Sequence, residues 1–243
     1  MKKETYDLKL TITRYGPEKG HYSSTFRLAV GGILRIVDVF RKINAELDST
    51  LAWRSSCEHA QCGSCTLIIN REPVLSCKLL VETAVEHFGT ENFHIEPMPL
   101  VPVLRDLVID FRYFENKILE SKPWLIEPAP DPLEGDEYRV PPEELAKYEE
   151  ATRCINCFTC RSGCPTQNPD YYGPNLLMQN YLRLLDPREG AKAERLKYLF
   201  DEKGLLRCRT GRFCTIGCPK EIPVSEFLAQ AKAYAGGATT LKG

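Results

Sequence analysis

The distribution of cysteine along this 243-residue chain is the feature that most limits what it can fold into. The chain has 11 cysteines, which fall in three groups at residues 57–77, 154–164 and 208–218. An odd number cannot close entirely into disulfides within one chain. Because the first residues alternate polar and apolar side chains without the apolar core of a secretory signal, we expect a reducing compartment. There, grouped cysteines more often bind metal than form disulfides.

The first group has the spacing C-x4-C-x2-C followed by a more distant cysteine, and its members are Cys57, Cys62, Cys65 and Cys77. This is the spacing of a plant-type [2Fe–2S] ferredoxin site. Gly63 permits a compact loop, and the Ser64 hydroxyl can donate a hydrogen bond toward sulfur. The alternatives are a zinc site, which normally uses two C-x2-C pairs, or inert buried cysteines.

The second group reads C-x2-C-x2-C-x3-C-P, the bacterial ferredoxin run, and consists of Cys154, Cys157, Cys160, Cys164 and Pro165. In two-cluster ferredoxins the first three cysteines of such a run hold one [4Fe–4S] cluster, and the fourth binds the other cluster. A second run is therefore required. It is present as Cys208, Cys214 and Cys218, but Gly211 stands where a further cysteine would complete the pattern.

The missing cysteine decides the type of the remaining clusters. Four ligands are available for a [4Fe–4S] cluster: Cys154, Cys157, Cys160 and Cys218. Only three thiolates remain for the other cluster, from Cys164, Cys208 and Cys214. The pattern therefore predicts a [3Fe–4S] cluster whose empty corner faces Gly211. The alternative is a fourth iron held there by water or hydroxide.

The first hundred residues have the pattern of a mixed α+β unit. Residues 6–15 and 22–30 predict a β-hairpin, and apolar residues at three- and four-residue intervals predict a helix over 36–47. Further expected strands cover 66–69, 74–77 and 93–96, and an amphipathic helix is expected over 104–121. Residues 1–121 are accordingly expected to form the first domain.

Prolines mark the expected domain boundary. Six of the 17 prolines lie between residues 122 and 142, where their fixed φ and missing N–H disfavour regular structure. We expect a linker over 122–142 and a helical domain over 143–243. Its expected helices are 143–152, 174–185, 191–201 and 224–235.

Composition and charge narrow the function. No run of 18 apolar residues predicts a membrane span, and the net charge of −1 argues against a nucleic-acid partner. Residues 1–150 carry 18 basic and 25 acidic residues, whereas residues 151–243 carry 14 and 8. The basic second part is compatible with anionic lipid headgroups or haem propionates, and equally with a solvated surface.

No residues of the chain form a recognisable acid–base or nucleotide site. A phosphate loop, a dinucleotide glycine fingerprint and a nucleophile elbow are all missing from the sequence. The four histidines lack the paired spacing of a Rieske centre and are given no role. Three clusters without a donor or acceptor predict an electron relay between partner subunits. The competing hypothesis is a free-standing electron carrier.

The order of the three cysteine groups resembles the iron–sulfur subunit of succinate dehydrogenase and fumarate reductase. The resemblance is carried by RSSC at 54–57, CGSC at 62–65, PVLRDLV at 102–108, CINC at 154–157, YGP at 172–174 and CTIGCPK at 214–220. It implies an N-terminal β-grasp [2Fe–2S] ferredoxin domain followed by an all-helical bacterial-ferredoxin-like domain.

The resemblance also implies partners and a location. A flavoprotein subunit with covalent FAD and the succinate/fumarate site would dock near the [2Fe–2S] end. A membrane anchor with a quinone site would dock near the [3Fe–4S] end, which places the chain peripherally on the cytoplasmic side of the membrane. The chain itself would supply no acid–base catalytic residue.

The sequence departs from the family near the third cluster. Many quinone-linked relatives have a Trp shortly after the Cys-Pro of the first run and a His after the first cysteine of the second, and both are missing here. Pro165 and Thr210 match positions that line the family's quinone pocket. The acceptor therefore stays open between ubiquinone, menaquinone, a haem-bearing anchor and a thiol/disulfide subunit.

Overall fold

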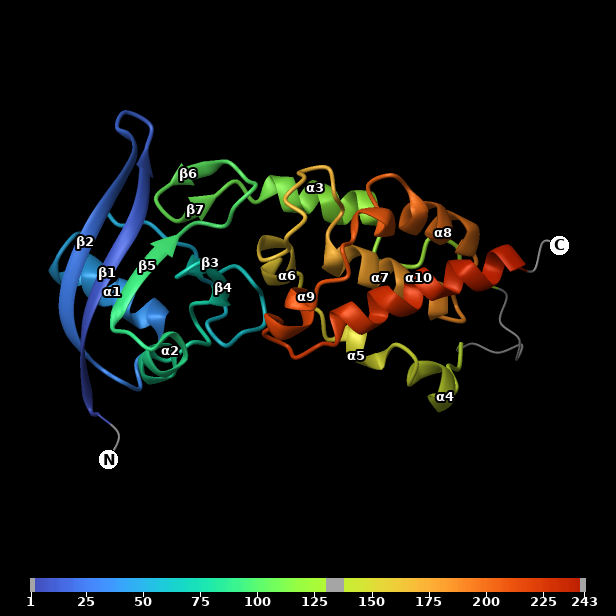
Figure 1. Cartoon of the computed structure of the whole chain (residues 1–243), viewed down its shortest axis with the longest axis horizontal. Helices are drawn as coiled ribbons and strands as arrows, with labels where there is room; N and C mark the ends of the chain where they lie inside the picture. Colours follow the sequence, from blue (N-terminus) through green and yellow to red (C-terminus); the bar gives the residue numbers. More distant parts are fainter. Residues whose placement is uncertain (1–2, 130–137, 241–243) are drawn as a thin grey trace. The chain divides into compact units, whose positions relative to one another are not determined.

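The computed structural model describes residues 3–129 and 138–240 (Figure 1) and divides into two compact units. The first unit comprises Met1–Phe111 and Ile155–Ser162, and the second comprises Arg112–Cys154 and Gly163–Gly243. The units therefore divide ten residues before the expected end of the first domain. A segment expected in the helical domain, Ile155–Ser162, belongs to the first unit because it packs on the first cysteine loop, as shown below.

The first unit is built on a five-stranded mixed sheet. Its strand order is β2-β1-β5-β3-β4, for the strands Gly20–Gly31, Thr5–Gly16, Asn92–Glu96, Thr66–Ile69 and Glu72–Leu75. β1 pairs parallel with β5, and the other pairings are antiparallel. Helix α1 (Ile36–Glu46) lies across one face of this sheet (Figure 1). The expected α+β class and β-grasp arrangement are confirmed.

Side-chain alternation explains how the sheet and α1 pack. Leu8, Leu10 and Ile12 point from one face of β1 and are almost completely buried. They share a core with Phe40 and Ile43 of α1. In both elements only one face meets the core. The buried apolar residues therefore alternate along β1 and recur every third or fourth residue along α1, and both periods are visible in the sequence.

Two parts of the first unit differ from expectation. Helix α2 (Val81–Phe88) was not predicted, since its eight residues give too short a pattern. The helix expected over 104–121 is wrong in its first half, which forms the hairpin β6 (Val103–Arg105) and β7 (Val108–Ile109). Only α3 (Arg112–Ser121) is helical.

Asp106 explains why a hairpin replaces the expected helix. It occupies the turn with a left-handed φ of 48°. Its carboxylate accepts hydrogen bonds from Nε and Nη2 of Arg14, at 3.0 and 2.9 Å, and both side chains are buried. The same carboxylate accepts a 2.9 Å bond from the Ala52 backbone N–H. This buried pair ties β1 and the hairpin to the segment that leads into the first cysteine loop.

The regular structure of the second unit's described residues consists of helices joined by loops. Its helices are α3, α4 (Pro142–Leu145), α5 (Glu149–Thr152), α7 (Pro174–Leu185), α8 (Lys192–Phe200), α9 (Phe213–Ile216) and α10 (Val224–Thr240), with a 3-10 turn at Leu205–Arg207. α7 is buried on nearly all sides and packs against α8 and α10 (Figure 1). The helices expected over 174–185, 191–201 and 224–235 are confirmed, and the one expected over 143–152 is split into α4 and α5.

The described part of the expected linker is packed into the second unit. Residues 130–137 lie outside the described residues. Side chains of α7 and α8 donate hydrogen bonds to backbone carbonyls of the described segment 122–129. The buried Arg195 of α8 donates hydrogen bonds to the carbonyls of Lys122 (2.7 Å) and Trp124 (2.5 Å) and pairs with the buried Glu189 at 2.6 Å. Proline prevents regular structure there, and a buried guanidinium supplies the partners that the backbone carbonyls need.

Among the residues that the structure describes, no helix is long and apolar enough to cross a membrane.

The buried pair between Arg14 and Asp106 gives a first prediction. Asp106→Asn is expected to lower the free energy of unfolding by about 3 kcal/mol, because the guanidinium stays buried without the one counter-charge that is itself buried. Anaerobic urea unfolding followed by tryptophan fluorescence measures the loss.

Asp48→Asn is the matched control. Asp48 binds the same guanidinium at 2.5 Å, but its side chain is 26% exposed, so the loss should be about 1 kcal/mol or less. Equal losses for the two variants would contradict the importance of the buried pair.

Candidate metal centres

The first cysteine loop is positioned by the hairpin of β3 and β4. Cys65 directly precedes β3, and Cys77 follows β4 by two residues. Because the two strands are antiparallel, with Thr66 opposite Leu75, these cysteines lie at the same end of the hairpin. The Ser76 backbone N–H donates to the Cys65 carbonyl at 3.2 Å, and both thiols are buried.

Backbone N–H groups of the loop point toward its sulfur atoms. Glu58 and Ala60 have left-handed φ values of 59°, an alternation that turns successive N–H groups to one side. Ala60 N–H donates to Sγ of Cys77 at 3.4 Å, and the N–H groups of Gln61 and Cys62 donate to Sγ of Cys57 at 3.3 Å. This concavity favours negatively charged sulfur.

The four thiols of the loop form two neighbouring pairs. In the inner pair, burial together with the adjacent Cys77 thiol raises the pKa of Cys65 to about 12. In the outer pair, burial opposes ionisation of Cys62, but hydrogen bonds from Ser64 and Cys57 outweigh it and lower its pKa to about 6. The Ser64 hydroxyl lies 3.2 Å from Sγ of Cys62, as the sequence predicts.

An arginine that sequence reasoning missed fixes the loop. Arg35, just before α1, donates from Nη1 to the Glu58 carbonyl at 2.7 Å and is held by Asp38 at 2.7 and 2.8 Å. The Glu58 carboxylate accepts from the Ser55 hydroxyl at 2.8 Å and pairs with Arg41. The Arg-x-x-Asp spacing at the start of a predicted helix was the available signal, but its target is remote in sequence.

The second cysteine segment packs directly on the first loop. An ideal Cβ added to Gly63 would lie only 2.6 Å from Cα of Cys157 and 2.8 Å from its Cβ. The Thr66 hydroxyl lies 2.9 Å from the Gly63 carbonyl and 3.0 Å from the Cys157 carbonyl. Cys157 is buried in one apolar group with Cys65 and Cys77. The first cysteine group therefore meets Cys157 of the second group within the first unit.

The four ligands expected for the second cluster are divided between the units. Cys157 and Cys160 belong to the first unit and are buried, whereas Cys154 and Cys218 belong to the second and are half-buried. Asn156 and Phe158 have left-handed φ values of 50° and 57°, the same alternation as in the first loop. The Thr159 hydroxyl lies 3.2 Å from Sγ of Cys157.

The structure brings the third cysteine set together in the second unit. One cavity is lined by Cys164, Pro165, Cys208, Arg209, Gly211 and Cys214, together with apolar neighbours. Burial, reinforced by Cys208 and Cys164 nearby, raises the pKa of the Cys214 thiol to about 12. Three thiols thus share the cavity with the glycine that the sequence singled out.

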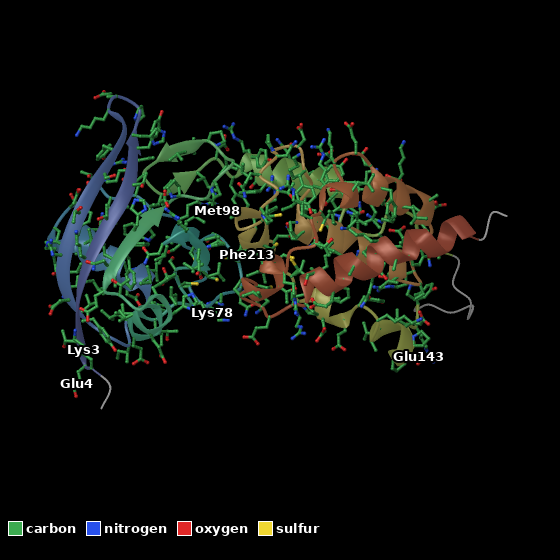
Figure 2. The ribbon with its side chains drawn as sticks, viewed as in Figure 1. Lys3, Glu4, Lys78, Met98, Glu143 and Phe213 are labelled. Carbon is green, nitrogen blue, oxygen red and sulfur yellow. The ribbon has the colours of Figure 1, made fainter. Side chains whose placement is uncertain are left out.

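Phe213 aligns the two segments that bear these cysteines. Figure 2 shows its side chain at α9, next to Cys214 in sequence. A Cβ on Gly163 would lie 1.7 Å from Cε1 of the Phe213 ring, so residue 163 must be glycine for the ring to pack there. Gly163 precedes Cys164, and this contact sets the two cysteine-bearing backbones side by side.

Of the two residues matched to a quinone pocket, only Pro165 lines this cavity, and Thr210 lies between two lining residues in sequence. Pro165 is exposed and lines it, and Thr210 is exposed with a left-handed φ of 59°. Lys232 of α10, which sequence reasoning missed, donates from Nζ to the Cys208 carbonyl at 2.7 Å and to the Thr210 hydroxyl at 3.0 Å.

The residues fit iron–sulfur clusters in their chemistry. In the described part of the chain, no three His, Cys, Asp or Glu side chains converge as ligands of a single metal ion. The thiols are instead arranged in pairs or around a cavity, beside N–H and hydroxyl donors that stabilise sulfur charge. Metal binding would also offset the raised pKa values of Cys65 and Cys214, because it favours the thiolate.

Comparisons with known proteins agree with this arrangement. A family model described as "2Fe-2S iron-sulfur cluster binding domain" matches residues 9–116. The chain is 34% identical to the fumarate reductase iron-sulfur subunit of Mycobacterium tuberculosis, over 93% of this chain and 92% of that one. The corresponding subunit of Haemophilus influenzae is 29% identical, over 93% and 91%. The solved Mycobacterium smegmatis Sdh1 complex in the apo form contains a chain that superimposes with a TM-score of 0.84 at 28% identity, covering 96% of this chain and 97% of that one.

The fold and the first loop define a ferredoxin-type iron–sulfur protein with a 2Fe-2S domain. The chain belongs to the family of iron–sulfur subunits of succinate dehydrogenase and fumarate reductase, which are oxidoreductase complexes. The resemblance drawn from the cysteine groups is thereby confirmed.

Gly63 gives a second prediction. Gly63→Ala should lower the free energy of unfolding by about 1–2 kcal/mol, because alanine disfavours the left-handed backbone at this position. The loss should be larger still, because the added Cβ would displace Cys157. We also expect a reduced amplitude of the first two cluster signals in electron paramagnetic resonance (EPR).

Gly89→Ala separates the two causes. Gly89 has a similar φ of 64°, but no described atom lies within 4 Å of its added Cβ. In this variant the free energy of unfolding should fall only by the amount due to the left-handed backbone, and the amplitudes of the cluster EPR signals should not change. If Gly63→Ala behaved in the same way, the close approach of Cys157 would have no role.

Proposed function

We propose that the chain relays electrons between a flavoprotein that carries the succinate/fumarate site and a membrane anchor that carries a quinone site. The observation that carries the proposal is the contact between the first two cysteine segments at Gly63. Electrons pass efficiently only between closely spaced centres, and this contact brings two ligand loops into one packed core. The family of the chain supports the same role.

The first proposed centre is a [2Fe–2S] cluster. The inner pair Cys65 and Cys77 would bind one iron, and the outer pair Cys57 and Cys62 would bind the other. The pairing follows from which thiols neighbour each other. The outer pair is less buried, which suits it to the side nearer an electron partner.

The other two proposed centres divide the remaining seven cysteines. Cys154, Cys157, Cys160 and Cys218 would hold a [4Fe–4S] cluster. Cys164, Cys208 and Cys214 would hold a [3Fe–4S] cluster, as supported by the cavity that these three share with Gly211. When bound, such clusters accept and pass single electrons without acid–base chemistry.

The surrounding residues tune and protect these sites. Hydrogen bonds from N–H groups and hydroxyls to sulfur stabilise the reduced, more negative state and so raise the reduction potential. Ser64 and Thr159 are placed for this at 3.2 Å from Cys62 and Cys157. The apolar side chains of Val37 and Leu75 around Cys65 and Cys77 exclude water.

The basic side of the second unit suits the membrane end of the relay. Lys232 and Arg209 lie at the third cysteine set, and positive charge there favours an anionic lipid surface or a quinone oxygen that gains charge. We propose Pro165 and Thr210 as quinone-pocket residues and a peripheral location on the cytoplasmic side of the membrane.

Removing one ligand tests the relay. In the purified complex, Cys65→Ala should abolish the [2Fe–2S] EPR signal, leave the other cluster signals, and uncouple flavin reduction by succinate from reduction of a quinone acceptor. Rapid-mixing absorbance of the flavin and the acceptor measures both steps.

Ser64→Ala is the matched control at the adjacent residue. It keeps all four thiolates, so the cluster should remain and only its reduction potential should fall. The function would be rejected if the native complex contained no covalent flavin chain and did not interconvert succinate and fumarate. If Cys65→Ala still coupled flavin reduction to reduction of the quinone acceptor, electrons would not pass through the first cluster, and the proposed relay would be contradicted.

A further inference from the structure

A groove separates two hairpins of the first unit. β1 pairs with β5 over Lys9–Ile12, whereas its last residues run on into the turn that leads to β2. The closed end of the β1–β2 hairpin lies beside the β6–β7 hairpin (Figure 1). The space between them, termed the hairpin groove, has a volume of about 450 Å³ and is lined by residues 14–19, Tyr22, Thr50 and 104–106.

Buried contacts hold the floor of the hairpin groove in place. The Asp106 backbone N–H donates to the Tyr15 carbonyl at 2.9 Å, and the ion pair between Arg14 and Asp106 joins the same two segments. Arg14 also donates from Nη2 to the Thr50 hydroxyl at 3.0 Å. Because these contacts join the segments on both sides, the groove exists before a ligand arrives, and binding would order little additional backbone.

Two basic side chains on the walls of the groove carry unmatched charge. Nη2 of Arg105 donates to the Thr50 carbonyl at 3.0 Å, and Nζ of Lys19 lies 5.7 Å from the centre of the Tyr22 ring. In the part of the chain that the structure describes, neither cation pairs with a carboxylate. The bond to the carbonyl fixes the Arg105 guanidinium, so its other N–H groups are placed to receive an anion.

Apolar surface lies next to these cations. Leu104 is 51% exposed, and it lines the groove together with Pro17 and the ring of Tyr22. A ligand with an apolar ring would cover Leu104 and lie against Tyr22, which removes apolar surface from water. An inorganic anion would use the cations alone.

We propose that the hairpin groove binds a small aromatic carboxylate. The carboxylate accepts hydrogen bonds from Arg105 and pairs with Lys19, while the ring packs on Leu104 and Tyr22. The volume of the groove falls within the range of small-molecule sites. None of its lining residues is a cysteine, so binding there depends neither on the clusters nor on the relay.

The test measures binding of 2-naphthoate to the full chain, purified anaerobically. Equilibrium dialysis, with the free ligand measured by its fluorescence, gives the stoichiometry and the dissociation constant. We expect about one ligand per chain with a dissociation constant on the order of 0.1–1 mM, as for other ligands of this size in a preformed site.

Two related compounds separate the contributions of charge and ring. The compound 2-naphthalenemethanol has the ring without the charge, and acetate has the charge without the ring. Each should bind about tenfold more weakly than 2-naphthoate or weaker still, because each loses one of the two kinds of contact.

Substitutions in the groove should change the affinity in opposite directions. Arg105→Gln should weaken binding of 2-naphthoate about tenfold, because it removes a charge-assisted hydrogen bond. Lys19→Gln should weaken binding about threefold, since an exposed cation contributes less. Glu18 also lines the groove and repels an anion, so Glu18→Gln should strengthen binding about twofold.

Arg27→Gln is the matched control. Arg27 is an exposed arginine of β2 outside the lining residues of the groove, so its substitution should leave the dissociation constant unchanged. Unfolding midpoints of all four variants check that the fold is kept.

Each outcome decides the proposal. A lack of saturable binding would overturn the site, and equal affinity of the wild type and Arg105→Gln would overturn it because the ligand would then bind elsewhere. If 2-naphthalenemethanol or acetate bound as tightly as 2-naphthoate, the groove would not recognise an aromatic carboxylate. Cluster EPR signals would be unaffected in each case, so failure here would leave the relay intact.

Discussion

The contact between Gly63 and Cys157 is the constraint on which the rest of the structure depends. With the backbones this close, any side chain at position 63 would push the second cysteine segment off the first loop. Ile155–Ser162 consequently belongs to the ferredoxin unit although it lies more than 80 residues beyond β3. The first cysteine loop and the segment that carries Cys157 therefore meet by packing inside a single compact unit.

Buried guanidinium groups fix the backbone around this arrangement. Arg14 joins the β6–β7 hairpin to the segment entering the first loop through Asp106, and Arg195 holds the proline-rich segment through Glu189 and backbone carbonyls. Both segments lack regular secondary structure, so their polar backbone groups need other partners. Arg35 performs the same task for the Glu58 carbonyl within the cysteine loop itself.

Short-range sequence patterns predicted the elements whose conformation depends on neighbouring residues. Alternation in β1 and the apolar period of α1 and α7 were sufficient for those elements, and cysteine spacing was sufficient to group Cys164, Cys208 and Cys214 around Gly211. The sequence failed where a distant partner decides the conformation. The expected helix at 104–111 gives way to a turn because Asp106 binds Arg14, 92 residues away. Ile155–Ser162 belongs to the first unit because Cys157 packs against Gly63, a pairing that no spacing rule contains.

The count of iron in the oxidised complex, combined with EPR, tests the central claim most directly. Eleven cysteines allotted to one [2Fe–2S], one [4Fe–4S] and one [3Fe–4S] cluster predict about nine irons per chain, a [3Fe–4S] EPR signal in the oxidised protein, and [2Fe–2S] and [4Fe–4S] signals after anaerobic reduction. Zinc in place of iron, or an iron content well below this value with one of the three signals missing, would contradict the relay.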